Sequence, residues 1–562
     1  MGYTVSDNQG KGFASTTMHK DLLLLKKISG FLIILSSCSI LLLFLYTTLN
    51  RLFYPYDLEW MEGGMLLHGL RVMEGQPLYV EPSSEFIPFI YPPLYSWFLG
   101  WSSFIFGLDY PVGRGISLIA SLLATGALIS IGRIEKLSWP ICFSMGAFFL
   151  STYENSGTFM DLVRTDSLVV ALVGWSLVFL RQRILWASGI LLCLAFLAKH
   201  NAAIFGIPMA LWLWRTYNIR SALEFAVYSA IPALLMTFYI QHTSDGFFLQ
   251  YLLEVPSVHP FVGSRFFWLA PYELISALSL MIFFIIFSTL VIHREDMWKH
   301  GSCLALMMIG FFFHDELIYF FQRNVLSSLP SRQSLEAAKS LSSIPMLCGG
   351  ISWLWWNKSL FKKYMLWLWC FLVSVLFCCI MRAHHGGYMN VLMPGFWFLS
   401  LILGFILQRF YMHKMGDYFL PPVILLQLAI GGWDPSSYIP TEKDIQKGDN
   451  LIAELKQIES PILAPFSPWY AYKAGHSATF HLIALWDINH KEGVLQSYVK
   501  NIRKDILEMR WSAILVANEK FDFGRKKYYP TRKKLRASQI APKPKIGWQA
   551  HSKILFFPVE KQ

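Results

Sequence analysis

The sequence predicts a polytopic α-helical membrane protein of about 13 transmembrane helices, followed by a small extracytoplasmic α/β domain. Only 15% of the residues are charged and 54% are hydrophobic, whereas a soluble protein carries roughly 25% charged residues. Long apolar runs such as 278–291 and 366–380 are typical of membrane helices, because a backbone in lipid must form its hydrogen bonds within its own segment. The polar start, residues 1–20, shows no cleavable signal pattern, so we expect the first span to be retained as an anchor.

The placement of Lys and Arg predicts the orientation of these helices, since basic residues concentrate on the cytoplasmic side of a membrane. Lys20, Lys26 and Lys27 precede the first apolar run, which places residues 1–28 in the cytoplasm. The short basic connectors that follow are assigned to the same side, and this leaves the C-terminal region outside. The predicted spans of the membrane domain, 29–431, are 29–50, 113–132, 139–153, 167–180, 184–198, 201–214, 221–240, 273–292, 300–314, 343–357, 364–381, 391–408 and 418–431.

A long first external loop is predicted at 51–112. Phe86–Leu108 is apolar enough to span the membrane, but a span there would move the later basic connectors outside, and Tyr91-Pro92-Pro93 interrupts its start. We expect an interfacial or re-entrant helix, with a true span as the alternative. Residues 59–74 have apolar side chains at helical spacing before Gly75-Gln76-Pro77, and we expect this helix to lie on the membrane surface.

Residues 432–562 are predicted to form a separate extracytoplasmic α/β domain, because helix and strand patterns alternate there. This region contains 21 Lys and Arg against 13 Asp and Glu. The basic excess suits anionic lipid headgroups or a solvated loop, and nucleic acid is not expected as a partner. The predicted elements are helices at 449–458 and 492–509 and strands at 462–466, 513–517 and 553–559.

Ionisable residues at the outer ends of the spans are the candidates for chemistry, because charges at membrane depth are costly and tend to be functional. On the predicted topology, four segments that are distant in the sequence face the same side. They contribute, in order, Asp57 and Glu59; Arg164 and Asp166; Lys199 and His200; and Arg382, His384, His385, Gly386, Gly387 and Asn390.

These residue types suit the transfer of a group from a phosphate to a hydroxyl. A carboxylate can accept the proton of an attacking hydroxyl, so Asp57, Glu59 and Asp166 are the candidate catalytic residues. Cations can stabilise a phosphate leaving group, and the candidates are Arg164, Lys199, His200, Arg382, His384 and His385. Substrate contacts are expected from Tyr91, Tyr95, Gly386, Gly387 and Asn390.

Each of these assignments has a plainer structural alternative. Asp57 could cap a helix, Glu59 could be a solvated residue, and Asp166 is a favoured N-cap type at the start of its helix. Lys199 and His200 could be interfacial anchors, and the glycine pair could be an ordinary turn. No HExxH spacing occurs, so no metal ligand is assigned, and a divalent cation stays open as a cofactor.

Together these motifs resemble the GT-C superfamily of membrane glycosyltransferases. The likeness covers roughly residues 30–410 and is greatest to the family of protein O-mannosyltransferases and lipid A aminoarabinose transferases (glycosyltransferase family 39). The residues that carry it are Tyr56-Asp57-Leu58-Glu59, Glu74-Gly75-Gln76-Pro77-Leu78-Tyr79, Tyr91-Pro92-Pro93-Leu94-Tyr95, Asp161-Leu162-Val163-Arg164-Thr165-Asp166-Ser167-Leu168, Leu197-Ala198-Lys199-His200-Asn201 and Gly386-Gly387-Tyr388-Met389-Asn390.

The resemblance implies transfer of a hexose or pentose from a polyprenyl-phosphate carrier to an acceptor on the outer side of the membrane, with inversion at the anomeric carbon. Asp57 matches the family's candidate base, with Asp166 in the second loop. Two departures stand out. Leu58 separates Asp57 from Glu59, where the protein mannosyltransferases have adjacent acids, and Ile90-Tyr91-Pro92-Pro93 replaces a lysine-containing step of the aminoarabinose transferases. A lipid A acceptor is therefore not expected.

The predicted activity is that of a glycosyltransferase in a bacterial inner membrane, with a cytoplasmic N-terminus and an extracytoplasmic C-terminal domain. Its expected partners are a polyprenyl-phosphate-sugar donor, membrane lipids, and a lipid, glycan or protein acceptor. A transporter or flippase of lipid-linked sugars is a rival, although such proteins usually contain internal repeats and broken helices, which the sequence does not show. A glycan polymerase or ligase, and a non-catalytic assembly subunit, are further alternatives.

Overall fold

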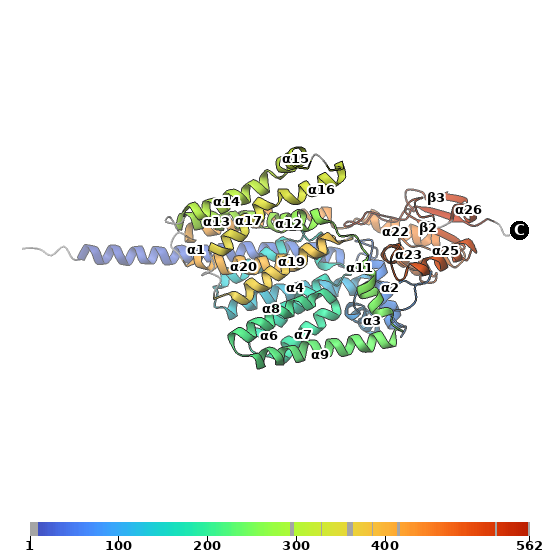
Figure 1. Ribbon diagram of the computed structural model, residues 1–562, viewed down its shortest axis with the longest axis horizontal. Coiled ribbons are helices and arrows are strands. Elements are labelled where there is room, and N and C mark those ends of the chain that lie inside the picture. The colour runs from blue at the N-terminus through green and yellow to red at the C-terminus, as the bar shows by residue number, and fades with distance from the viewer. Residues whose placement is uncertain are drawn as a thin grey trace, which may run out of the picture.

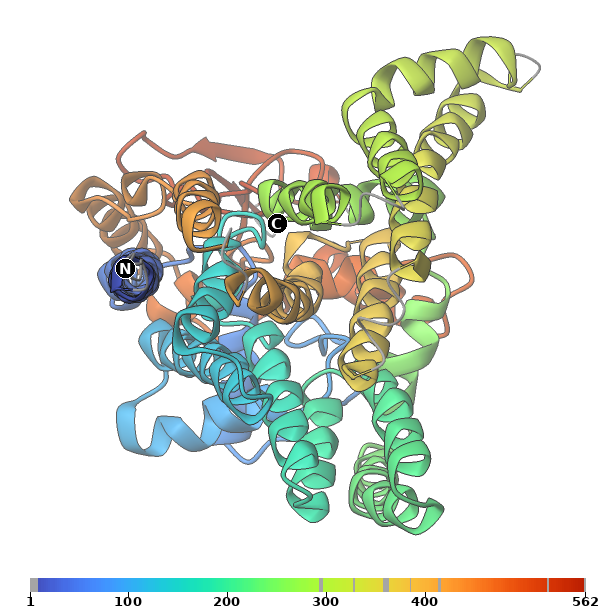
Figure 2. The same cartoon turned by 90° about the vertical axis from the view of Figure 1, so that its left-hand side faces the viewer.

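The computed structural model describes residues 9–292, 297–326, 329–356, 363–384, 386–412, 416–522 and 525–559. The molecule is elongated, with the start of the first helix protruding at one end and the C-terminal sheet at the other (Figure 1). The helices between them run roughly along the long axis, as the end-on view in Figure 2 shows.

Within these described residues, five helical segments are long and apolar enough to cross a membrane, and two bent pairs of helices raise the number to as many as seven. The five are residues 24–52 of α1 (Gln9–Leu52), α4 (Tyr110–Ile134), α9 (Ile219–Thr243), α19 (Met365–Ala383), and the run formed by η6 (Met389–Leu392) with α20 (Met393–Tyr411). The bends are 80° between α12 (Ala270–Ala277, preceded by η4, Arg265–Leu269) and α13 (Ser279–Ile292), and 78° between α14 (Met297–Phe312) and α15 (His314–Asn324).

The remaining predicted spans are also helical, but they are shorter than a membrane crossing requires on its own. The predicted number of spans therefore stays a prediction. These shorter helices are α5 (Trp139–Ser151), α6 (Asp166–Arg181), α7 (Leu185–Ala198), α8 (Gly206–Thr216, after η2, His200–Phe205), α17 (Ile344–Trp356) and α21 (Gly416–Ile430). Several helices were not expected. Among them, α15 and α16 (Ser331–Ser342) pair in a hairpin that leans away from the bundle (Figure 2).

The first external loop contains two helices, α2 (Glu62–Met73) and α3 (Leu94–Phe106). The 13 residues of α3 are too few for a full crossing, and its last turn exposes Phe104, Ile105 and Phe106. The expectation that α2 lies on the membrane surface was wrong. Its first nine residues are buried, because α2 packs against α3 on one side and against α23 (Pro468–Lys473) of the C-terminal region on the other.

The C-terminal region forms a small α/β layer, as predicted. Its four-stranded sheet has the order β1-β2-β4-β3, in which β1 and β2 are parallel and the other neighbours antiparallel. The predicted strands correspond to β1 (Ile462–Leu463), β2 (Ala513–Val516) and β4 (Ile554–Phe557), whereas β3 (Thr531–Lys534) was missed because its four residues are polar and exposed. Charged side chains on such an edge strand discourage pairing with another chain. The helices are α22 (Glu442–Leu455), α23, α24 (Leu482–Ile488), α25 (Val499–Leu507) and α26 (Arg525–Tyr528).

Candidate active site

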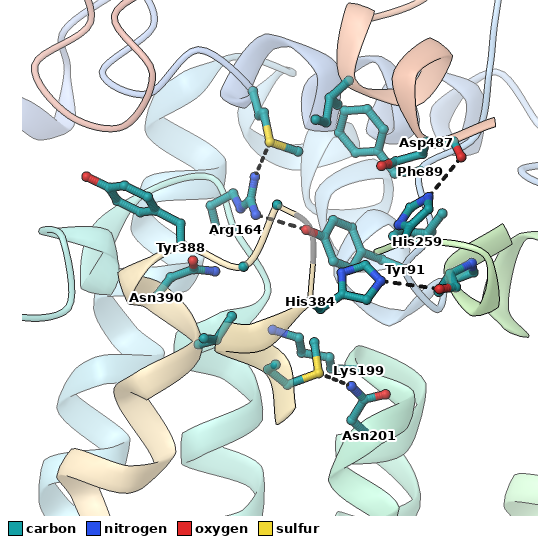
Figure 3. Close-up of a pocket in the computed structure, with 18 of the residues that line it drawn as sticks. Phe89, Tyr91, Arg164, Lys199, Asn201, His259, His384, Tyr388, Asn390 and Asp487 are labelled. Atoms are coloured by element: carbon teal, nitrogen blue, oxygen red, sulfur yellow. Dashed lines mark hydrogen bonds between the residues drawn. The ribbon is translucent and has the colours of Figure 1, made fainter. Parts of the chain in front are cut away.

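A cavity of about 800 Å³ lies where one end of the helix bundle meets the C-terminal α/β region. Its walls come from the first external loop, the segment before α6, the start of η2, the loop after α11 (Val255–Ser257), the end of α19, and two segments of the C-terminal region (Figure 3). The lining residues with polar groups include Glu59, Tyr91, Arg164, Lys199, His200, Asn201, His259, His384, Tyr388, Asn390 and Asp487. The four predicted segments are therefore brought together.

A fully buried ion pair fixes the loop that carries the acids. Both side chains, Arg114 of α4 and Glu62 of α2, are 0% exposed, with Nη2 of Arg114 2.7 Å from Oε2 of Glu62. Arg114 also donates to the carbonyls of Arg51, Tyr54 and Tyr56. Glu62 accepts the N–H groups of Leu58 and Val163. Burial alone would raise the pKa of Glu62, but Arg114 and these hydrogen bonds lower it below its usual value, so the pair stays ionised.

Glu59 lies in the cavity wall and is 2% exposed. Its Oε2 is 3.6 Å from Nη1 of Arg164. Burial raises the pKa of Glu59 to about 7, although Arg164 opposes the rise. A carboxyl group that titrates near neutral pH is suited to exchanging protons with a substrate.

The C-terminal region holds Glu59 in place from the other side. Residues 59 and 546 form an isolated parallel bridge, and the N–H groups of Lys545 and Ile546 both reach the carbonyl of Leu58. Gly547 follows with φ +71°, and a Cβ on it would lie 3.1 Å from Cγ and 3.2 Å from Oε1 of Glu59. The positive φ and this close approach both favour glycine here.

Asp57 does not line the cavity. Its Oδ1 accepts the N–H of Gly63, in the first turn of α2, and the hydroxyl of Tyr110, each at 2.9 Å. Asp57 thus satisfies an N–H group at the N-terminus of α2 and acts as a cap for this helix, whereas the sequence alternative was a cap at the end of a membrane span. Burial raises its pKa well above the usual value.

Arg164, Lys199 and Asn390 line the cavity, and Asp166 lies behind them. The carboxylate of Asp166 is 2.9 Å from Nζ of Lys199 and 3.0 Å from Nδ2 of Asn390, and 3.9 Å from Nε of Arg164. Arg164 also donates to the hydroxyl of Tyr91 at 2.9 Å, as Figure 3 shows. Asp166 is therefore placed to orient two cations and an amide, and it does not lie in the wall itself.

Two predicted site residues, Arg382 and Tyr95, form their contacts outside the cavity. Arg382 forms a forked ion pair with Glu273, with both N–O distances 2.8 Å, and donates to the carbonyl of Gly387. It is thus placed to shape the glycine loop, and it does not line the cavity. Tyr95 is buried outside the cavity, where its hydroxyl donates to the carbonyl of Gly113, which fixes α3 on α4. Neither residue fits the role predicted for it.

Four of the five predicted histidines and glycines line the cavity. His200, His384, Gly386 and Gly387 line the cavity as expected, and Nε2 of His384 approaches the carbonyl of Pro256 at 3.4 Å. His385 lies outside the described residues. No group of three or more His, Cys, Asp or Glu side chains in the described part of the chain is arranged to hold a metal ion.

Asp487, in α24 of the C-terminal region, was missed by the sequence analysis. It lines the cavity opposite Lys199 and Asn201 (Figure 3). Burial raises the pKa of Asp487 to about 8, and Arg164 opposes the rise. Its backbone carbonyl is 2.9 Å from Nε2 of His259. The signal available in the sequence was a single carboxylate within the otherwise apolar run 482–488.

Comparison with known proteins adds a structural likeness. No protein-family model and no curated protein matches the chain. Two crystal structures of ArnT from Cupriavidus metallidurans, one bound to undecaprenyl phosphate and one in the apo state, are similar over 93% of this chain and 97% of the ArnT chain. The sequence identity is 13% and the TM-score 0.44. Values this low describe a similar course of the chain, and they assign neither a substrate nor a site residue to this protein.

Proposed function

We propose that the protein is a GT-C-type glycosyltransferase that moves a sugar from a polyprenyl-phosphate carrier to an acceptor hydroxyl in this cavity. The observation that carries the proposal is that the buried carboxyl group of Glu59, 3.6 Å from Arg164, lines one partly apolar cavity together with Arg164 and Lys199. Burial raises the pKa of Glu59 to about 7. The reaction needs a proton acceptor for the hydroxyl and positive charge for the departing phosphate. The side chains of Ile380 and Met381 at the end of α19 offer an apolar wall to the carrier lipid.

The proposed step is a single displacement at the anomeric carbon. The acceptor oxygen attacks this carbon from the face opposite the phosphate, the bond from carbon to phosphate oxygen breaks, and its electron pair leaves with the phosphate. Glu59 takes the hydroxyl proton. The products are the glycosylated acceptor, with inverted configuration, and the free polyprenyl phosphate.

Glu59 is preferred to Asp57 and Asp166 as the base because of where the three carboxylates lie. Asp57 caps α2 outside the cavity, and Asp166 is held by Lys199 and Asn390 behind its wall. Only a group within reach of the hydroxyl can take its proton directly. The proposal therefore moves the base from Asp57, the sequence-based candidate, to Glu59, and gives Asp166 a positioning role.

Arg164 and Lys199 are proposed to bind the donor phosphate. Arg164 offers a planar fork of N–H groups and Lys199 a compact charge, which are complementary ways of holding phosphate oxygens. Tyr91 and Asp166 hold these two cations through their hydrogen bonds. A positively charged pair fixed before the reaction stabilises the negative charge that develops on the leaving phosphate.

The proposed location is a bacterial inner membrane, with the N-terminus in the cytoplasm and the cavity on the outer side. This orientation rests on the Lys and Arg distribution of the connectors. The donor then enters from the outer leaflet. The sugar is a hexose or pentose by resemblance alone.

The pH dependence of transfer tests the proposal. We expect membranes that contain the full chain to transfer label from at least one member of a panel of radiolabelled polyprenyl-phosphate sugars, unlike membranes that lack it. Because Glu59 acts when deprotonated and burial raises its pKa to about 7, kcat/KM should rise with pH through about 7. Below that pH it should fall about tenfold per pH unit. Absence of transfer from every donor across this range would overturn the proposed function.

A substitution of Gly547, which lines the cavity beside Glu59, is expected to disturb the Glu59 carboxyl group. In Gly547→Ala the new methyl group would press on the Glu59 carboxyl group, and a small misplacement of a catalytic group reduces turnover by about tenfold to hundredfold. The matched control is Gly475→Ala. Gly475 has φ +93° but no neighbour within 4 Å of an added Cβ, so both variants share a strain of about 1–2 kcal/mol and only one meets Glu59. Equal transfer rates in the two variants would contradict this role of Gly547.

A further inference from the structure

Three tryptophans meet at the end of the cavity formed by the C-terminal region. Trp60 of the first external loop is 4.7 Å from Trp548 and 5.9 Å from Trp486, and Trp486 is 5.2 Å from Trp548, between ring centroids. All three line the cavity. Segments separated by more than 400 residues in the chain thus converge on a single aromatic cluster.

The cluster is held rigidly by a buried histidine. His481 is 4.6 Å from the Trp60 ring, and its Nε2 donates to the carbonyl of Trp60 at 2.9 Å. Its Nδ1 accepts the N–H of Ile483 at the start of α24. Burial lowers the pKa of His481 to about 3, so the ring is neutral and keeps both hydrogen bonds. Trp60 is thereby tied to the helix that carries Trp486.

Two of the three indoles stay open to the cavity. Trp486 is 43% exposed and Trp548 40%, whereas Trp60 is 6% exposed. Large apolar side chains that are exposed next to one another mark a binding surface more often than a single exposed side chain does. Two carboxyl groups, Asp487 and Glu59, flank them in the sequence and line the same cavity.

We propose that Trp60, Trp486 and Trp548 form the acceptor subsite and that this subsite takes a sugar ring, so that the acceptor is a carbohydrate. This inference rests on the proposed function and adds the class of acceptor to it. The donor would occupy the other end of the cavity, near Lys199 and Met381, and the acceptor would occupy the end at α24 (Figure 3).

The chemistry of the cluster favours a sugar over its competitors. A pyranose has an apolar C–H face, which packs on an indole ring, and a rim of hydroxyls, which bond to carboxyl groups. Asp487, with its pKa raised to about 8, is protonated at neutral pH and can both donate to and accept from a hydroxyl. A cationic ligand would be repelled by Arg164 and Lys199 in the same cavity, and a lipid chain would offer no hydrogen-bonding partner to the Asp487 carboxyl group.

The position of the cluster also suits the reaction. Trp60 follows Glu59 directly in the chain, and Trp548 follows Gly547, which packs against the Glu59 carboxyl group. A sugar ring resting on these indoles would therefore have a hydroxyl near the proposed base. Orientation of this kind is a large part of what a transferase supplies to a bimolecular step.

Binding of simple glycosides tests the subsite independently of turnover. Purified full-length protein in detergent is mixed with methyl glycosides of glucose, galactose, mannose and N-acetylglucosamine, and saturation-transfer NMR detects which protons lie against the protein. We expect at least one glycoside to bind through its C–H face and the signal to be lost in the double variant Trp486→Ala/Trp548→Ala. The control is Trp186→Ala, a tryptophan 59% exposed on α7 and outside the cavity. Binding of none of the glycosides, or equal binding by the double variant, would overturn the inference.

A kinetic measurement separates failure of the subsite from failure of the proposed function. With a donor that wild-type membranes turn over, Trp486→Ala or Trp548→Ala should raise the acceptor KM about tenfold while the donor KM stays unchanged. Trp486→Phe keeps an aromatic face, so its acceptor KM should lie between the values of the wild type and Trp486→Ala. This variant also serves as a control for the case in which Trp486→Ala fails to fold. A donor KM that rises together with the acceptor KM, or acceptance of a serine-containing peptide in preference to every sugar, would overturn the carbohydrate assignment. The proposed transfer reaction would still stand.

Discussion

Replacing Glu59 with glutamine is expected to reduce sugar transfer by about 10²–10⁴-fold, the usual contribution of a general base. Glutamine keeps the shape of the side chain and its contact with Gly547, but it cannot accept the proton of the acceptor hydroxyl. Glu59 is buried beside Arg164, so the change removes a negative charge from the cavity without removing packing. The measurement is the transfer rate in membranes at matched protein abundance, for wild type and Glu59→Gln across a pH series.

Two further variants sharpen this experiment. Glu74→Gln lies in the same external loop but on the surface, so its transfer rate should equal that of the wild type. Asp57→Asn alters the cap of α2 and should lower abundance or thermal stability more than turnover per molecule. The pH dependence centred near 7 should disappear in Glu59→Gln. If Glu59→Gln stays active while Asp57→Asn is inactive at normal abundance, the base is Asp57 and the proposed assignment is wrong.

Removing the positive charge of Arg114 is expected to destabilise the protein by about 3–5 kcal/mol, because an uncompensated Glu62 would remain in a fully buried position. Arg114→Met would also release the carbonyls of Arg51, Tyr54 and Tyr56, and these residues lead directly into the segment that carries Glu59. We therefore expect a large loss of thermal stability and of folded protein in the membrane. Unfolding of the detergent-purified protein, followed by heat or by SDS titration, measures it.

A double-mutant cycle distinguishes a specific buried pair from general sensitivity of this region. Arg114→Met/Glu62→Gln contains no unpaired charge, so its destabilisation should be smaller than the sum of the two single effects, by an interaction energy of about 0.5–3 kcal/mol. Lys504→Met breaks an exposed pair with Glu508 and should change stability by about 1 kcal/mol or less. Additive effects at Arg114 and Glu62 would contradict the pairing.

The helices of the membrane domain were largely predictable, and so were three of the four strands. Apolar runs and the positive charges at their ends set the position of helices such as α4 and α19, and the apolar segment Ala513–Ala517 set a strand. Helix ends and bends were less predictable: α1 begins at Gln9, before the predicted span 29–50, and the predicted span 273–292 is bent by 80° between α12 and α13. The hairpin α15–α16 was not expected, because the apolar residues 317–321 of α15 are too few for a span and α16 is largely polar.

The sequence predicted which segments form the candidate site, but it did not predict the role of each residue in it. Arg164, Lys199, His200 and Asn390 were expected together because their segments share one side of the topology, and they do line one cavity. Asp57 and Glu59 lie in an irregular segment between α1 and α2, where no helix or strand periodicity predicts the direction of each side chain. Glu59 lies in the wall, whereas Asp57, two residues earlier, faces Tyr110.

The contribution of the C-terminal region to the cavity could not be predicted from the sequence, for a different reason. Asp487 and Trp486 lie more than 400 residues from Glu59, and no periodicity connects two segments at such a separation. Tertiary contacts bring them together, such as the docking of Lys545 and Ile546 on Leu58 and of His481 on Trp60. The prediction of a separate C-terminal domain therefore located its elements but did not show that they reach the site.

The backbone pairing between Leu58 and residues 545–546 also constrains the biogenesis of the protein. The segment that carries Glu59 and Trp60 is synthesised about as early as the first membrane helix. The C-terminal residues that complete the cavity are synthesised only after α21, the final helix of the membrane domain, has left the ribosome. Throughout that interval Glu59 and Trp60 have no partner from the C-terminal region. A nascent or truncated chain would thus be inserted in the membrane without a closed cavity, and catalytic competence would arrive with the last segment to fold.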